Sequence, residues 1–233
     1  MSKLYLIPNT IAEQGPWTIP AYIGQSIAQV RIFFVEEPKS ARRLLKQIDT
    51  AFPIQECRFF DLNEHTKPVQ VQEYLKVLKE GDSGIISESG CPCMADPGAD
   101  LVLLAHHNHI NVIPLVGPSS IALALMASGL SGQNFAFNGY LPKDKQARAA
   151  KIKALEKRAL QEGQTQIFME APYRNQNVFD DLLANCSGQI LLCVACGITG
   201  KEEFIKTKTI QQWQKTNLSL PKQPALFIIN KSL

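Results

Sequence analysis

The first half of the chain alternates short apolar runs with segments of helical periodicity, and this alternation constrains the fold more than any other feature. Strands are expected at 4–8, 30–35, 84–86 and 111–115, and helices at 38–48, 69–79, 97–107 and 119–128. Repeated strand and helix units at this spacing predict an α/β domain with a largely parallel sheet. A ligand of such a sheet binds outside the carboxyl ends of its strands.

The pattern changes after Gly129, where strands and long polar helices alternate less regularly. Strands are expected at 135–138, 166–170, 189–195, 203–207 and 225–230, and helices at 143–161, 176–183 and near residue 212. A chain of 233 residues is long enough to bury two cores. We therefore expect two α/β domains, 1–116 and 117–233, with a mixed sheet in the second.

Composition and hydropathy place the chain among ordinary globular proteins. Hydrophobic residues make up 45% and charged residues 19%, which argues against a disordered chain. The longest apolar runs are far shorter than the ~20 residues that span a bilayer. The opening residues, MSKLYLIP, lack the pattern of a signal peptide. These features predict a cytoplasmic protein with reduced cysteines and no membrane segment.

The most unusual stretch is SESGCPCMADPG at 87–98, between an expected strand and an expected helix. Asp96 is expected to be the N-cap of that helix. Gly90 and Pro92, at the end of the strand, suit close approach of the backbone to a ligand. The loop 114–120 also joins a strand to a helix, and we expect it beside the first loop at the edge of the sheet.

Neither a metal site nor a phosphate loop is expected. Cys91 and Cys93 supply only two ligands, whereas a structural zinc site needs four. Cys193 and Cys196 lie on an expected strand at an odd spacing, so their side chains face opposite sides of the sheet. The chain also lacks the glycine-rich sequences that bind nucleotide phosphates.

Basic residues are concentrated near two expected helices. The candidates for contact with RNA phosphates are Lys39, Arg42, Arg43, Lys143, Lys145 and Arg148. Two solvated helix faces explain the same pattern equally well. The net charge is only +3, so any contact with nucleic acid has to come from such local clusters.

Four ordered motifs are spread over most of the chain: SESGCPCMADPG, VIPLVGPSS at 112–120, NGYLP at 138–142 and EAPYR at 170–174. In these motifs the sequence resembles the tetrapyrrole methylase superfamily of S-adenosylmethionine-dependent methyltransferases. Within it, the chain is most similar to the ribosomal RNA small-subunit methyltransferase I branch, which methylates cytidine at the ribose 2′-oxygen. The resemblance implies two α/β domains with a cofactor cleft between them, S-adenosylmethionine as the methyl donor, and a homodimer.

The resemblance also implies a set of site residues. The cofactor would contact Pro8, Ser89, Gly90, Cys91, Pro92, Met94, Pro118, Ser119, Ser120, Leu141, Pro142, Pro224, Ala225 and Leu226. Methyl transfer is an in-line displacement on an activated sulfonium, so positioning can supply much of the rate without a covalent intermediate. Glu88 or Asp96 could orient the acceptor hydroxyl or help to remove its proton, although Asp96 is equally explained as a helix cap.

The N-terminal motifs depart from the family pattern. Where the family reads P-T-P-I-G-N, this chain reads PNTIAE at 8–13, so that Ala12 replaces a glycine and Glu13 an asparagine. The family's E-D-T-R becomes EEPK at 36–39, with Lys39 in place of an arginine. Ribosomal RNA or the small ribosomal subunit is the first expected partner. Methylation of a tetrapyrrole or another small molecule, and RNA or ribosome binding without catalysis, stay open as alternatives.

Overall fold

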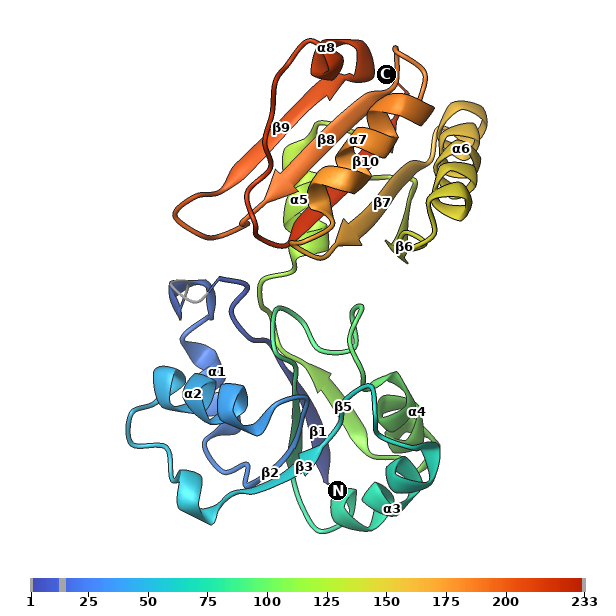
Figure 1. Ribbon diagram of the computed structural model, residues 1–233. Helices are drawn as coiled ribbons and strands as arrows, with labels where there is room; N and C mark the ends of the chain where they lie inside the picture. The colour runs from blue at the N-terminus through green and yellow to red at the C-terminus, as the bar shows by residue number, and fades with distance from the viewer. Residues whose placement is uncertain (1, 13–15, 232–233) are drawn as a thin grey trace. The chain divides into compact units, whose positions relative to one another are not determined.

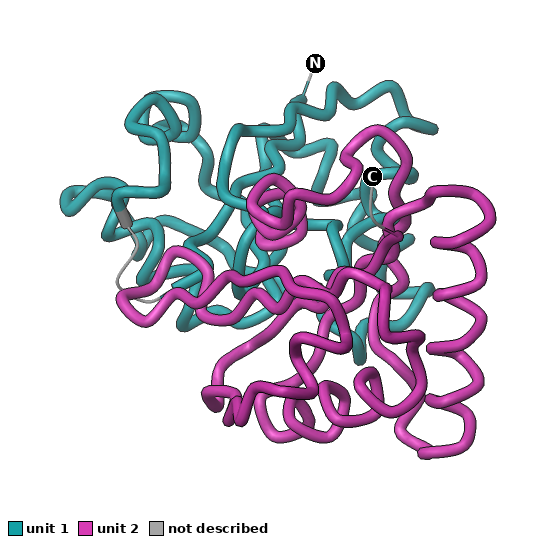
Figure 2. Tube along the Cα trace, turned by 90° about the horizontal axis from the view of Figure 1, so that it is seen from above, with its two compact units in different colours: residues 1–119 teal, residues 120–233 magenta. Residues whose placement is uncertain are grey.

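The computed structural model describes residues 2–12 and 16–231. The chain forms two compact units, residues 1–119 and residues 120–233 (Figure 2). Each unit contains a five-stranded sheet with helices packed against it (Figure 1). Within the described residues, no helix has both the length and the apolar character needed to cross a membrane. Glu13, one of the departures from the family pattern, lies outside the described residues.

The first unit is a parallel sheet. Its strands are β1 (Lys3–Ile7), β2 (Ile32–Val35), β3 (Arg58–Asp61), β4 (Ser83–Ile86) and β5 (Asn111–Pro114). Its helices are α1 (Tyr22–Ile27), α2 (Pro38–Ile48), α3 (Pro68–Leu78) and α4 (Ala99–His107), with short 3-10 helices at Pro16–Thr18 and Ile54–Glu56. The strand order is β3-β2-β4-β1-β5, and all neighbouring strands are parallel. The predicted parallel α/β sheet is confirmed.

Both faces of this sheet are covered by helices, as the side chains of β2 show. Phe33 and Val35 lie in a core shared with α1 and α2, whereas Ile32 and Phe34 lie in a second core shared with α3 and α4. From β1 the chain crosses to β2, and from β4 it crosses back over β1 to β5. The carboxyl ends of β1 and β4 therefore form the kind of crevice in which doubly wound sheets bind their ligands.

The second unit is built on a mixed sheet. Its elements are α5 (Ser120–Ser128), β6 (Phe135–Tyr140), α6 (Lys145–Glu162), β7 (Thr165–Glu170), α7 (Asn175–Asn185), β8 (Leu191–Cys196), β9 (Phe204–Thr209), α8 (Ile210–Gln214) and β10 (Ala225–Asn230). The strand order is β6-β7-β10-β8-β9, with β6 and β7 parallel and the other pairs antiparallel. Helices α6, α7 and α8 contribute to one core with Phe168 and Phe227, while α5 lies on the other face (Figure 1). The predicted mixed sheet is confirmed.

Helix α4 begins later than the sequence predicts. Its N-cap is Gly98, which has a φ of 128°, and no side chain caps the helix. Asp96 is therefore not the N-cap, and that prediction is wrong. The Asp96 side chain instead forms a hydrogen bond with the Ser87 side chain, and Cys93 and Ala95 before it adopt positive φ values of 65° and 66°.

Candidate functional site

The loop after β4 is attached to the end of β1 through Asn9. This side chain is 4% exposed, and its Nδ2 donates to the carbonyl oxygens of Ser87 (3.0 Å) and Glu88 (2.9 Å). The backbone N–H of Asn9 donates to the Gly90 oxygen at 2.8 Å, and the two residues form an isolated β-bridge. One buried residue thus fixes the start of the SESGCPCMADPG loop at the carboxyl edge of the sheet.

The loop after β5 reaches the same place. A Cβ atom on Gly117 would lie 2.1 Å from Cβ of Pro8, so the loop can approach β1 only because residue 117 is glycine. Cys91 Sγ lies 3.4 Å from the carbonyl oxygen of Pro118, a weak S–H···O hydrogen bond. Gly90 has a φ of 69°, and a Cβ there would lie 3.4 Å from the same oxygen. The loops after β4 and β5 are therefore in direct contact.

The other predicted cofactor residues near these loops differ in exposure. Pro8, Pro92 and Pro118 are buried, whereas Ser89 and Met94 are exposed. The buried prolines shape the loops, and the exposed residues can meet a ligand directly. Ser119 is the last residue of the first unit, and Ser120 begins α5 in the second.

Three carboxylates belong to the same edge of the first unit: Glu36, Glu88 and Asp96. Glu36 Oε2 accepts a hydrogen bond of 3.1 Å from the backbone N–H of Glu88. Burial, assisted by the negative charge of Glu36, raises the pKa of Asp96 to about 6, and a hydrogen bond with the Ser87 side chain opposes this rise. A carboxyl group with this pKa can exchange a proton close to neutral pH.

The two thiols of this loop, unlike the Asp96 carboxyl group, do not exchange a proton readily near neutral pH. Burial raises the pKa of Cys91, and burial together with the nearby charge of Asp96 raises the pKa of Cys93 to about 11. The thiolate, which is the form that ligates metals and attacks electrophiles, is thus disfavoured. Within residues 2–12 and 16–231, no three metal-ligating side chains gather into a group that could hold an ion.

The predicted cofactor residues of the second unit lie at one edge of its sheet: Leu141, Pro142, Pro224, Ala225 and Leu226. Ala225, the first residue of β10, pairs with Glu170 at the end of β7 and with Cys196 at the end of β8. The segment after β6 is held at this edge by Arg174, whose Nη2 donates to the carbonyl oxygens of Leu141 (3.2 Å) and Pro142 (3.1 Å). Each unit therefore contains its own cluster of predicted residues.

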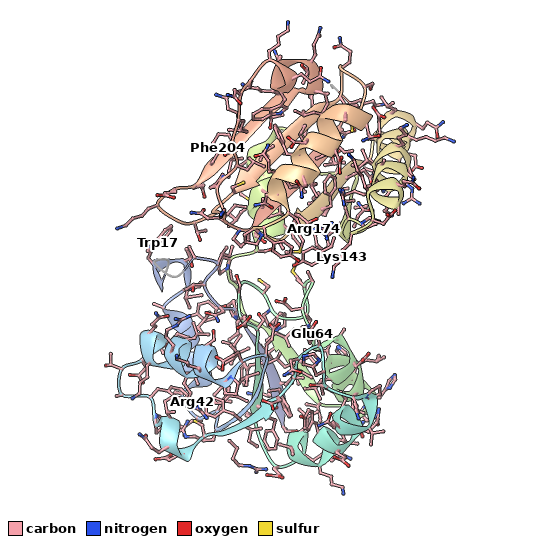
Figure 3. All side chains as sticks on the ribbon, viewed as in Figure 1. Trp17, Arg42, Glu64, Lys143, Arg174 and Phe204 are labelled. Atoms are coloured by element: carbon pink, nitrogen blue, oxygen red, sulfur yellow. The ribbon has the colours of Figure 1, made fainter. Side chains whose placement is uncertain are left out.

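The predicted RNA contacts divide into exposed and buried residues. Those exposed are Lys39, Arg42, Arg43, Lys143 and Lys145. Arg42, labelled in Figure 3, places its guanidinium 4.8 Å from the centre of the Phe59 ring. Arg148 is only 7% exposed, and its Nε donates to Asp181 Oδ2 at 2.7 Å. The expected contact of Arg148 with RNA is contradicted, because its charge is buried in an ion pair.

Sequence reasoning missed Asn9, Glu36 and Gly117. For Asn9 and Glu36 a signal was present, because each is a polar residue at the carboxyl end of an apolar strand, where parallel sheets carry their chemistry. For Gly117 the sequence offered less. Its requirement for glycine comes from contact with Pro8, more than 100 positions earlier in the chain.

Comparison with known proteins places the chain in a family, although no protein-family model matches it. It is similar to ribosomal RNA small subunit methyltransferase I of Vibrio cholerae, with 30% identity over 204 residues, which cover 87% of this chain and 67% of that protein. The Haemophilus influenzae protein of the same name is 28% identical over 219 residues, covering 94% of this chain and 74% of that protein.

Two solved structures share the fold. Uroporphyrin-III-C-methyltransferase from Thermus thermophilus has a TM-score of 0.57 and 15% identity, covering 99% of this chain and 92% of that chain. The methyltransferase CobJ has a TM-score of 0.63 and 14% identity, covering 100% of this chain and 95% of that chain. Identities this low bear on the fold alone. Together with the relatives named above, they show that this chain is a methyltransferase with a tetrapyrrole methylase fold and belongs to the ribosomal RNA small subunit methyltransferase I family.

Proposed function

We propose that this protein transfers a methyl group from S-adenosylmethionine to a ribose 2′-hydroxyl of small-subunit ribosomal RNA. The observation that carries the proposal is the direct contact between the loops after β4 and β5, with Cys91 Sγ 3.4 Å from the Pro118 oxygen. The family resemblance assigns both loops to one cofactor. The names of the curated relatives support ribosomal RNA as the acceptor. A tetrapyrrole acceptor and a non-catalytic role are not favoured.

The residues at this edge fit the cofactor. Gly90 adopts a φ of 69°, which glycine tolerates best, and its backbone packs close to the Pro118 oxygen of the second loop. Ser89 and Met94 are exposed and would hold the polar and apolar parts of the cofactor. When bound, the cofactor supplies a methyl group already activated on a sulfonium. We propose that the cluster around Leu141 and Ala225 in the second unit completes its binding.

The carboxylates Glu88 and Asp96 would act on the acceptor. An ionised Asp96 carboxylate can accept the proton of a ribose hydroxyl, or orient that hydroxyl through a hydrogen bond, and its pKa of about 6 keeps it largely ionised above neutral pH. Glu88 is exposed and can serve the same purpose. The Glu36 carboxylate fixes the backbone N–H of Glu88 and so positions the start of the loop.

The exposed basic residues would hold the RNA. Lys39, Arg42 and Arg43 belong to α2, Lys145 is the first residue of α6, and Lys143 lies two residues before it. Side chains of this kind bind phosphates without reading sequence, so they would position the acceptor strand. We further propose that the first domain faces the acceptor and that the protein is a homodimer, as the family resemblance implies, and that it works in the cytoplasm.

The acceptor is tested by methyl transfer from radiolabelled S-adenosylmethionine. The purified protein is incubated with small ribosomal subunits lacking the modification, and in parallel with porphyrinoid precursors. Label in the ribosomal RNA, recovered after digestion as a ribose-methylated nucleoside, is the expected result. Label in the porphyrinoid alone would replace the proposed acceptor, and no label in either would remove the proposed activity.

A further inference from the structure

Two largely buried arginines, Arg148 and Arg174, donate hydrogen bonds to three consecutive carbonyl groups in the second unit. Arg148 Nη1 donates to the oxygens of Pro142 (3.1 Å) and Lys143 (2.8 Å). Arg174 Nη2 donates to the oxygens of Leu141 (3.2 Å) and Pro142 (3.1 Å). The oxygen of Pro142 therefore accepts from both guanidinium groups. We call Arg148 and Arg174 the Pro142 clamp; Figure 3 labels Arg174 and Lys143, whose segments meet here.

Each arginine of the Pro142 clamp is itself held by a carboxylate. Arg148 Nε donates to Asp181 Oδ2 on α7 at 2.7 Å, and both side chains are about nine-tenths buried, with exposures of 9% and 11%. Arg174 Nη2 lies 3.1 Å from Glu170 Oε2, with side-chain exposures of 12% and 1%. A buried ion pair is costly to desolvate and is weak evidence for added stability, but removing one partner would leave the other charge buried and unpaired.

The Pro142 clamp binds a segment that belongs to no strand or helix. Residues 141–144 connect β6 to α6, and their carbonyl groups follow the last strand pair. A guanidinium offers several N–H groups in a rigid planar fork, so two forks meeting at one carbonyl fix the peptide plane as well as its position. Binding sites need such support, because small displacements of a wall residue weaken ligand contacts.

We infer that Arg148 and Arg174 are positioning residues for S-adenosylmethionine, acting through the backbone of Leu141 and Pro142. The inference rests on the proposed function, in which these two residues form part of the cofactor's binding wall. It assigns a role in the cofactor site to Arg148, a residue whose charge in the sequence suggested RNA. Neither arginine needs to touch the cofactor, because the carbonyl groups that they hold set the shape of the wall.

The inference is tested with Arg148→Lys, Arg174→Lys and the double variant in the full chain. Lysine keeps the positive charge beside each carboxylate but loses the fork, so the buried ion pairs persist while the clamp is weakened. The dissociation constant of S-adenosylmethionine is measured by calorimetry at a temperature where circular dichroism shows every variant folded. We expect each single variant to bind about fivefold more weakly. The double variant should fall short of the product of the two effects, because both act on one segment.

Arg158→Lys provides the matched control, because Arg158 is an exposed arginine of the same helix, α6. Hydrogen exchange at residues 141–147 supplies a readout that does not depend on the cofactor, and it should be faster in both clamp variants than in the control. If the wild-type protein binds S-adenosylmethionine and the folded clamp variants bind it with the same affinity, the inference is overturned and the proposed function is not. Failure of the wild-type protein to bind S-adenosylmethionine would overturn the proposed function, and the inference with it.

Discussion

Single residues decide whether the loops after β4 and β5 can come into contact. Gly117 is the clearest case, because a Cβ atom at this position would overlap the ring of Pro8. At Arg148 the charge of the side chain was weighed, but its position on the helix was not. Its positive charge suggested the surface, but it lies four, seven and eleven positions before the buried Ile152, Leu155 and Ala159, on the core face of α6. The helical spacing could therefore have predicted that Arg148 is buried, whereas its ion-pair partner Asp181 could not be predicted from the sequence.

Gly117→Ala should destabilise the protein by about 1–3 kcal/mol, the usual cost of overpacking a filled site. The added methyl group would lie 2.1 Å and 2.3 Å from ring carbons of Pro8, so either β1 or the loop after β5 must shift. Urea unfolding measures the change. Gly81→Ala is the control, because a Cβ at residue 81 meets nothing within 4 Å. Equal stability of the two variants would contradict the contact.

Asp96→Asn should stabilise the protein at pH 8, and the advantage should disappear below about pH 4. The folded-state pKa of Asp96, about 6, lies above its ordinary value of 3.8, so the folded state binds the proton more tightly than the unfolded state. Stability from this group is therefore full at low pH and is lost as the pH rises from about 4 through about 6. Asparagine cannot ionise and avoids that loss.

The comparison uses the free energy of unfolding of both proteins at pH 4, 6 and 8, so that titration of other groups largely cancels. If the difference in the free energy of unfolding between variant and wild type stays constant across this range, Asp96 has an ordinary pKa. In the methylation assay, a role for Asp96 as proton acceptor requires the rate of the wild-type protein to rise through about pH 6.

At the scale of elements, helices and strands with a strong hydrophobic periodicity could be predicted from the sequence, whereas short elements with a weak periodicity could not. Helix α2 and strand β10 have the predicted bounds, because each carries an uninterrupted pattern. Strand β3 (Arg58–Asp61) was not predicted, because its apolar core is only Phe59 and Phe60, which are held by ring contacts with Phe33 and Phe34 on β2. Helix α1 was missed as well, being a six-residue segment with a glycine inside it.

Helix α6 offers a test of its capping. The Asp144 side chain accepts a hydrogen bond of 2.8 Å from the backbone N–H of Ala147, which satisfies one free donor of the first turn. Asp144→Ala should cost about 1 kcal/mol in the free energy of unfolding, whereas Asp144→Asn keeps an accepting oxygen and should cost much less. Urea unfolding of the two variants beside the wild type measures both. An alanine variant as stable as the wild type would mean that the cap contributes nothing.

At the scale of the whole molecule, the sequence predicted two α/β domains and the change from a parallel to a mixed sheet. The reason is physical: parallel neighbours need a crossover such as a helix between them, and the first half alternates strands and helices regularly, whereas β8 and β9 follow each other without a helix and pair antiparallel. The residues that join loops across the chain were harder to foresee. Asn9 and Gly117 act through contacts between distant positions, and such contacts leave little trace in local periodicity.

Binding to RNA should depend on salt through the exposed basic residues. Lys39→Ala should weaken binding to small-subunit RNA and lower the slope of log affinity against log salt by about 0.7–0.9, the contribution of one phosphate contact. Filter binding at several salt concentrations measures the slope. Lys79→Ala, which removes an exposed lysine just after α3, should leave it unchanged. Identical slopes for wild type and Lys39→Ala would exclude Lys39 from the RNA contact.

The central claim is that the loops after β4 and β5 bind the methyl donor. Calorimetric titration with S-adenosylmethionine of the wild type, Cys91→Thr and Cys91→Phe tests it most directly. Cys91 is half-buried beside the Pro118 oxygen, so threonine fits nearly the same space, whereas a phenyl ring is too large for it and would displace the two loops from each other. The account predicts saturable binding by the wild type and Cys91→Thr, and its loss in a folded Cys91→Phe. Equal binding by all three proteins, or no saturable heat from the wild type at millimolar ligand, would contradict it.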